Sequence, residues 1–525
     1  MNFILAITPL LLILILMVGL RWSAAQAGAA GYLCALVIAV VFFGCDLELL
    51  AYAHMKALLL TVDVLLIIWA AFLLYRVADE AGAIQTIGQA LPRLTPDVVM
   101  QALIIGWVFA SFLQGVGGFG VPVAVISPIL VGLGFTPLAA VVIPSIGHGA
   151  AVTFGSMGSS FQALLAATGQ PEELLTPPAA AFLSISCLVV GLMVAHLAGG
   201  WAAVRRLWAP VLILGVVMGS VHFLVVTRGP WNIGAFLSGL AGLVVVFPLV
   251  HWIKKRSKIQ PPPAAIDQEP PGNNLHPNSE ERGRLLVSLS AYAILIVVIL
   301  CMQLIPVVKE FLGQVVIKVQ FPEITTSLGY TTPAGLGRKI NIFGHTGVLL
   351  LYSSILAYLV YRWAGLYKPG SAARILSGTL KRVISSSVSI ASMLTMAVIM
   401  EHAGMTEVIA RGLAQGTGKL FPLISPWIGA IGAFMTGSNT NSNVVFGSLQ
   451  MQTAQLLNYP IPIILAAQTA GAALASVMAP TKIVVGVSTV GMAGKEGEVM
   501  RKLAIYTVLL VLLVSLMAMI GVMIP

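Results

Sequence analysis

Apolar runs long enough to cross a membrane recur along the whole chain, separated by short polar connections. A helix needs about 20 residues to cross the hydrocarbon layer of a bilayer. Runs of that order predict membrane helices near residues 4–20, 28–44, 57–75, 98–113, 178–198, 208–227, 232–252, 285–305, 345–363, 383–400 and 503–524. Arg21 follows the first run and no basic residue precedes it, so we expect a retained helix and not a cleaved signal peptide. The pattern predicts an all-α polytopic membrane protein.

Composition supports the same class. Hydrophobic residues make up 58% of the 525 positions and charged residues only 9%, and a soluble domain could not bury that much apolar surface. The net charge of +10 lies in short clusters between apolar runs, which indicates membrane orientation and not a nucleic-acid surface. The four cysteines lack metal-ligand spacing. We expect no disulfide framework, no metal and no other cofactor.

A polar stretch rich in proline and asparagine divides the chain into two transmembrane halves, 1–252 and 285–525. Residues 253–284 begin with a basic cluster and are expected to form a flexible cytoplasmic linker. Counting spans back from this linker places Arg205 and Arg206 inside, and if Arg21 and Arg76 are cytoplasmic as well, the N-terminus lies outside. The basic residues within 309–339 then fall in a long outer loop, against the general charge rule. We expect a multi-pass protein of the cell membrane, and the sequence leaves a homodimer open.

An internal repeat relates the two halves. A shift of 322 positions aligns these pairs: Ala81 with Ala403, Gly82 with Gly404, Phe112 with Phe434, and Gly115 with Gly437. By the charge count, corresponding spans run in opposite directions through the membrane. Inverted repeats are typical of alternating-access transporters whose site lies where the repeats meet. Chance similarity among apolar segments is the alternative.

Each half interrupts its apolar pattern twice, at matching places. The breaks lie at 114–122 and 145–160 in the first half, and at 436–443 and 468–482 in the second. Glycine and asparagine disfavour a continuous helix, and irregular backbone persists in a membrane only where protein or a water-filled cavity satisfies it. We therefore expect the breaks to form one pocket at mid-depth, where exposed helix N-termini suit a carboxylate.

The predicted substrate-binding residues come from these breaks. Hydroxyl and amide groups can bond the oxygens of a carboxylate or a hydroxyl beside it. The predicted set is Gln114, Gly115, Gly117, Gly118, Gly120, His148, Ser438, Asn439, Thr440, Asn441, Asn443 and Thr469. Lys482 is expected either to neutralise the bound carboxylate or to snorkel to the membrane interface.

Ionisable residues inside apolar segments are candidates for ion coupling, because a charge at mid-membrane is expensive. Asp63 stands in the middle of a span, where it either carries a coupling proton or forms a structural pair with a base. His148 titrates near neutral pH and is either a ligand of substrate or proton, or a hydrogen-bonded structural group. Glu401 and His402 end a span and are expected to be solvated.

At the breaks, the sequence resembles the lactate permease family. The resemblance is carried by Phe112 to Gly120, Leu130 to Phe135, Phe154-Gly155, Gly437 to Asn443 and Gly494-Lys495-Glu496. It implies proton-coupled symport of lactate, glycolate or a related 2-hydroxy acid, with no enzymatic activity. Ser438-Asn439-Thr440 is also similar to a tripeptide of dicarboxylate symporters, which implies re-entrant hairpin tips and an elevator-type movement.

The sequence departs from the family pattern at three candidate positions. Members of the family often have Glu where Gln114 stands, Asp where Asn439 stands and Asn where His148 stands. These changes keep a sodium-coupled carrier of another organic anion open as an alternative, and a passive anion channel as a more distant one. A membrane enzyme is disfavoured, because no His-rich or Asp-rich motif suited to metal-assisted chemistry is present.

Overall fold

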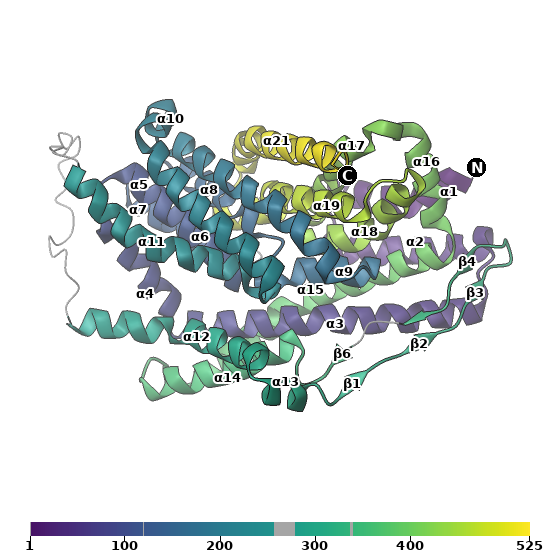
Figure 1. Cartoon of the computed structure of the whole chain (residues 1–525), viewed down its shortest axis with the longest axis horizontal. Helices are drawn as coiled ribbons and strands as arrows, with labels where there is room; N and C mark the ends of the chain where they lie inside the picture. Colours follow the sequence, from purple (N-terminus) through teal and green to yellow (C-terminus); the bar gives the residue numbers. More distant parts are fainter. Residues whose placement is uncertain (1, 119, 257–278, 337–339, 525) are drawn as a thin grey trace.

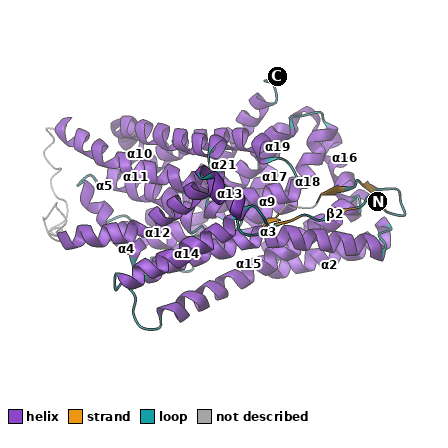
Figure 2. Ribbon diagram, turned by 60° about the horizontal axis from the view of Figure 1, so that its bottom comes forward, coloured by secondary structure: helices purple, strands orange, loops and turns teal. Residues whose placement is uncertain are grey.

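The computed structural model describes residues 2–118, 120–256, 279–336 and 340–524, and most of them lie in helices (Figures 1 and 2). The helices before the predicted linker are α1 Asn2–Leu14, α2 Ala24–Phe43, α3 Leu47–Glu80, α4 Ala83–Ala90, α5 Val98–Leu103, α6 Ala110–Val116, α7 Val121–Gly132, α8 Pro137–Gly147, α9 Ser159–Thr168, α10 Glu172–Arg228 and α11 Gly234–Arg256. Those after it are α12 Ser279–Leu304, α13 Pro306–Leu312, α14 Thr346–Trp363, α15 Ser371–His402, α16 Met405–Thr417, α17 Phe421–Thr436, α18 Asn439–Leu456, α19 Ile461–Ala475, α20 Pro480–Thr489 and α21 Glu496–Gly521. Residues 257–278 of that linker lie outside the described residues.

Within the described residues, 12 helical stretches are long and apolar enough to cross a membrane. The number rises to 13 if the bent pair Pro137–Ala151 and Ser156–Thr168 counts as one span. The prediction of an all-α polytopic membrane protein is therefore confirmed.

Helix α10 contains two of the predicted spans and folds back on itself. At Gly200 the backbone has φ +66° and ψ −164°, a region open in practice only to glycine. Beyond this turn the second arm packs against the first, with Gly215 against Leu188 and the Ser184 hydroxyl 3.1 Å from Nδ1 of His222. The two predicted spans thus form an antiparallel hairpin.

The order of elements repeats along the chain, as the shift of 322 positions predicts. Gly82 (φ +70°) separates α3 from α4, and Gly404 (φ +79°) separates α15 from α16 in the same way. The series α7, α8, α9 and α10 then corresponds to α18, α19, α20 and α21. The inverted orientation of the repeats and an elevator-type movement stay predictions.

Helices from the two halves are packed together. Helix α3 contacts α14 and α15, and α9 contacts α18; α3 and α15 run alongside each other in both ribbon views (Figures 1 and 2). Gly347 of α14 faces the backbone of Leu66, where an added Cβ would lie 2.5 Å from the carbonyl oxygen. Small residues let helix backbones approach closely in a membrane, where van der Waals packing replaces the hydrophobic force between helices.

A narrow β ribbon follows α13 and departs from the all-helical expectation. Three antiparallel pairs form it: β1 Val316–Ile317 with β6 Ile340–Asn341, β2 Gln320–Phe321 with β5 Gly335–Leu336, and β3 Ile324–Thr325 with β4 Thr331–Thr332. Its tip bonds to the turn before α3, with the Ser327 amide 3.1 Å from the carbonyl oxygen of Gly44. The Tyr330 ring covers Gly404, whereas nothing lies within 4 Å of a Cβ added at the matching Gly82.

The ribbon tip and the helix ends that flank residues 257–278 lie at opposite ends of the bundle. Figure 1 shows β3 and β4 at the right-hand end, and the end of α11 and the start of α12, which flank residues 257–278, at the left. This arrangement agrees with placing one of them outside and the other in the cytoplasm. That the linker end is cytoplasmic and the ribbon end is outside stays a prediction from the charge count.

We expect Gly115→Ala to lower the free energy of unfolding by about 1–3 kcal/mol, the usual cost of overpacking. The added Cβ would lie 2.5 Å from Cα of Phe236, so α6 and α11 would have to separate. Gly132→Ala is the matched control, because nothing lies within 4 Å of its added Cβ. Thermal unfolding in detergent measures both, and equal melting temperatures for Gly115→Ala and the wild type would contradict the close packing.

Candidate functional site

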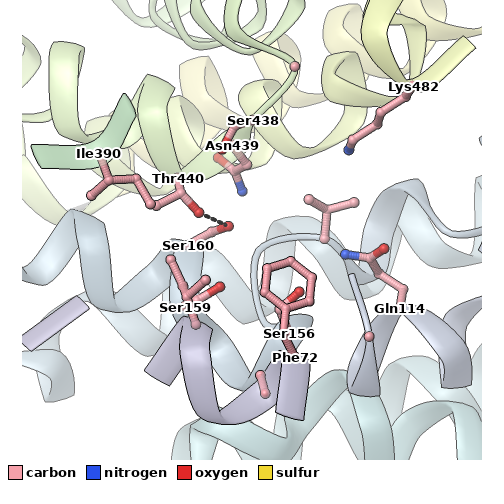
Figure 3. Close-up of a pocket in the computed structure, with 15 residues that line it drawn as sticks. Phe72, Gln114, Ser156, Ser159, Ser160, Ile390, Ser438, Asn439, Thr440 and Lys482 are labelled. Carbon is pink, nitrogen blue, oxygen red and sulfur yellow. Dashed lines mark hydrogen bonds between the residues drawn. The ribbon is translucent and has the colours of Figure 1, made fainter. Parts of the chain in front are cut away.

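The predicted breaks surround one small pocket (Figure 3). Its walls come from α3, the end of α6, residues 152–160, α15, the start of α18 and α20. The cavity measures about 30 Å³, which is room for one or two waters. Both halves of the chain therefore contribute to a single site, and the site is contracted in this conformation.

Two helices begin at the pocket wall. Ser159 and Ser160 open α9, and Asn439 and Thr440 open α18. The hydroxyl groups of Ser160 and Thr440 lie 3.0 Å apart and join the two helix ends. The first N–H groups of a helix lack partners within the helix and carry partial positive charge, so this wall favours an anion.

Lys482 places a basic side chain beside these helix ends. The residue is 6% exposed, and its Nζ donates to the Ser476 hydroxyl at 2.9 Å. No carboxylate of the described residues lies within ion-pair distance of it. Figure 3 shows its nitrogen directed into the pocket, with the Gln114 amide nitrogen facing it from the other side. A buried ammonium group without a counter-charge is costly, so a bound anion would stabilise the protonated form of Lys482.

Two residues that line the pocket each have a side-chain oxygen without a hydrogen-bond partner among the described residues. Oε1 of Gln114 and Oδ1 of Asn439 are buried and have no partner among the described residues. Asn439 uses its Nδ2 to donate to the Thr153 hydroxyl at 3.0 Å. Because buried polar atoms are usually paired, each of these oxygens could accept from a ligand hydroxyl or a water after the amide turns or the pocket widens.

A buried network behind the pocket holds the breaks together. Nδ2 of Asn443 donates to the carbonyl of Ser160 and to the hydroxyl of Thr469, each at 2.9 Å. The Thr153 hydroxyl lies 3.2 Å from the carbonyl and the hydroxyl of Thr469. Asn443 and Thr469 are thus placed behind the pocket wall, where they link the first half to the second.

The glycines of the first break differ in their surroundings. Gly117 lines the pocket, whereas Gly115 packs against the backbone of Phe236. Gly118 (φ +57°) leaves no room for a Cβ beside the Ser156 hydroxyl, and Gly120 (φ +81°) is the N-cap of α7. The break therefore depends on left-handed backbone that glycine adopts without strain.

Two further predicted residues, Asn441 and Ser438, form hydrogen bonds within the protein at the start of α18. Asn441 donates through Nδ2 to the Ser389 hydroxyl of α15 at 2.9 Å, while Ser438 is the N-cap of α18 and accepts from the Asn441 amide at 3.2 Å. Ser438 lines the pocket and Asn441 does not.

His148 is buried outside the pocket wall. Its Nδ1 donates to the carbonyl of Pro144 at 2.6 Å, so Nε2 is left as an acceptor, and no described residue pairs with it. Of the two readings, ligand or structural group, the contact with Pro144 supports a structural part, and a role in transport stays a prediction.

Asp63 lies beside a base, and a structural pair with a base is one of the two roles predicted for it. Its Oδ1 lies 3.0 Å from Nε2 of His345, and its Oδ2 accepts from Nε2 of Gln162 at 2.6 Å. The sequence reasoning missed both partners. His345 immediately precedes α14, and an ionisable residue at the start of an apolar span is the signal that would have drawn attention to it.

The expectation that His402 is solvated was wrong. Its side chain is buried, with Nδ1 2.9 Å from the carbonyl of Val398. Glu401 is half-buried, 3.9 Å from Nζ of Lys56. Both residues line a second cavity of about 390 Å³ under Tyr330 of the ribbon tip, which explains why the end of this span is covered.

Comparison with known proteins identifies the family. The family model described as L-lactate permease matches residues 2–525. The chain belongs to the L-lactate permease family. A chain of this permease family with 12 candidate spans among its described residues is a multi-pass membrane transporter.

Relatives within the family are distant in sequence but similar in length. The chain is 26% identical to the glycolate permease GlcA of Escherichia coli (strain K12), an alignment that covers 95% of this chain and 92% of that protein. It is 28% identical to the L-lactate permease of Salmonella typhimurium, covering 83% and 80%, and 26% identical to that of Bacillus subtilis, covering 94% and 91%. A solved structure, that of the Alcanivorax borkumensis YdaH transporter, is similar with a TM-score of 0.49 and 14% identity, covering 91% and 89%.

We expect Ser438→Ala to cost about 1 kcal/mol of stability, because the N-cap bond to the Asn441 amide is lost. Ser438→Asn keeps a capping side chain and should cost much less. Thermal unfolding of the purified variants measures the difference. If Ser438→Ala melts at the wild-type temperature, the N-cap is not a stabilising part of this helix end.

Proposed function

We propose that this permease is a secondary active symporter that imports a small monocarboxylate: L-lactate, glycolate or a related 2-hydroxy acid, driven by a proton gradient. The observation that carries the proposal is Lys482, a buried cation that lines the pocket at the starts of α9 and α18. A carboxylate in this pocket would meet one full positive charge and the partial charges of two helix N-termini. The printed names of the relatives, glycolate permease and L-lactate permease, support the same class of substrate.

The acceptors of the pocket favour a hydroxyl beside the carboxylate. Oε1 of Gln114 and Oδ1 of Asn439 can each accept from a substrate O–H. A simple carboxylate without a hydroxyl would leave these buried oxygens unpaired, which costs about 1–3 kcal/mol. This difference is the physical basis for preferring lactate over propionate.

Apolar side chains limit the size of the substrate. Ile68 and Phe72 of α3 and Ile390 of α15 close one side of the pocket. The cavity of about 30 Å³ must widen before it admits an acid with several heavy atoms. Binding is therefore coupled to a change of conformation, as alternating access requires.

Gln114 and Asn439 have neutral side chains, and this is why the transport assay must compare proton and sodium gradients. Without a carboxylate at either position, the described pocket wall carries Lys482 as its charged side chain, so proton coupling must use a group elsewhere. A sodium gradient is the appropriate alternative driving force to test. The orientation with the N-terminus outside belongs to the same proposal.

Uptake of radiolabelled L-lactate into proteoliposomes tests the proposal. We expect accumulation with an inward proton gradient, none with an inward sodium gradient at equal pH, and competition by unlabelled glycolate that exceeds competition by propionate. Accumulation driven by sodium alone would reject the coupling ion. Equal competition by propionate would reject the role of the hydroxyl.

We expect Lys482→Met to weaken L-lactate binding by about 10-fold or more, because a charge-assisted hydrogen bond contributes about 1.5–3 kcal/mol. Methionine keeps most of the volume, so the loss should appear in KM for uptake at unchanged protein amount. Lys495→Met is the matched control, since Lys495 lies outside the pocket at the N-cap of α21. Wild-type KM in Lys482→Met would remove this lysine from the substrate site.

A further inference from the structure

A buried acid, a histidine and an amide join three helices next to the pocket. Asp63 of α3 is 1% exposed. It receives hydrogen bonds from Gln162 of α9 at 2.6 Å and from His345, the N-cap of α14, at 3.0 Å. We call Asp63, Gln162 and His345 the coupling cluster.

The backbone of α14 determines the tautomer of His345. The amide N–H of Gly347 donates to Nδ1 of His345 at 3.2 Å, so Nδ1 carries no proton. The proton of the neutral ring is therefore on Nε2, and it is donated to Asp63. These contacts correspond to a neutral histidine beside an ionised carboxylate.

Adding one proton to the cluster breaks one of these contacts. If the proton binds Nδ1 of His345, that atom becomes a donor and faces the Gly347 N–H, so the N-terminal cap of α14 is lost. If it binds Oδ2 of Asp63, the O–H meets the Gln162 amide as donor against donor, and the amide must rotate or move away. Protonation is thus linked to a change in how α3 holds α9 or α14.

Helices α3 and α9 both form walls of the substrate pocket. Ser160 lines the pocket two residues before Gln162 on α9, and Ile68 lines it five residues after Asp63 on α3. Five residues of helix span about 7.5 Å. A movement at the coupling cluster therefore reaches the contracted pocket through rigid helix and needs no further relay.

The other charged groups that approach α3 lie toward its two ends. Helix α15 places Glu401 at Lys56, Arg374 at Glu80 and the Arg382 guanidinium over the Phe72 ring. Helices α4, α6 and α9 carry no ionisable side chain. The ionisable residues of α12 are Glu280, Glu281, Arg282 and Arg284 near its start, Tyr292, which packs against Phe112 and Phe236, and Cys301, and those of α14 are Tyr352, Tyr358, Tyr361 and Arg362. His345 is an ionisable side chain at hydrogen-bond distance from Asp63, with its Nε2 3.0 Å from Oδ1.

We propose that the His345–Asp63 pair is the proton-binding site of this permease and that Gln162 transmits its charge state to the pocket. The proposal rests on the proposed proton-driven symport. One proton from the outer solution neutralises the carboxylate charge, α9 is released from α3, and the pocket widens for the substrate anion. The proton leaves to the cytoplasm after the substrate does, which restores the contacts described above. Loading by both ligands is thereby favoured over loading by one.

Two variants separate proton coupling from substrate binding. His345→Asn keeps a capping oxygen for α14 but is too short to bond Asp63. Asp63→Asn keeps the shape of the carboxylate and imitates its protonated form, because its amide NH2 meets the Gln162 amide as donor against donor. We expect accumulation of L-lactate under a proton gradient to fall to equilibrium in both, while Asp63→Asn, which imitates the protonated state, still exchanges internal for external L-lactate.

His54→Gln is the matched control. His54 lies on the same helix, away from the coupling cluster, and its ring bonds Tyr32 and the carbonyl of Leu50. It should accumulate L-lactate as the wild type does. Proton-driven accumulation at the wild-type level in either cluster variant would overturn the proposal.

A measurement without substrate makes the test independent of the proposed function. Hydrogen–deuterium exchange of the α9 peptide, residues 159–168, should increase in the wild type and in His54→Gln when the pH is lowered, after correction for intrinsic exchange. In Asp63→Asn it should be raised at both pH values. An α9 peptide whose protection does not depend on pH in the wild type would overturn the proposal. Absence of L-lactate exchange in the wild type would instead reject the proposed substrate.

Discussion

The structure depends on one constraint: a backbone N–H or C=O group inside a membrane must find its hydrogen-bond partner within the protein. Broken helices violate this rule unless they face other polar groups. Here the breaks face one another, and side chains such as Asn443 bond the carbonyl of Ser160 across the boundary between the halves. The pocket is the space left where these interruptions meet, so its polarity is a direct result of what the breaks need for stability.

Much of the architecture could be predicted from sequence. Apolar runs of sufficient length predicted the spans, and the glycine-rich and asparagine-rich interruptions predicted where the pocket would form. The shift of 322 positions also aligns the helices that follow each break. These features are encoded locally, by length and by residues that disfavour helix, and local signals can be read without knowing the packing.

The direction of individual side chains could not be predicted in this way. Asn439, Asn441 and Asn443 are equivalent in sequence terms, yet they point to Thr153, to Ser389, and to Ser160 with Thr469 respectively. Successive helical residues differ by about 100°, so only the packing of α18 against α9 and α15 determines which one faces the pocket. The bond between Asp63 and His345 joins residues 282 positions apart, and no local pattern indicates it. The short strands of the ribbon are likewise too brief to leave an alternating pattern.

The ribbon makes the two ends of the molecule unequal. The turns at Gly82 and Gly404 occupy matching places in the repeat, but Tyr330 covers only the second of them. In a carrier made of two equivalent inverted halves, the conformations open to either side would have the same energy. The β ribbon is attached at one end of the molecule and removes that equality, because opening the face that it covers requires work that opening the other face does not. Such a carrier would have different resting populations and different half-saturation concentrations on its two faces, with maximal rates that differ in the same proportion, so that no net transport occurs without a gradient.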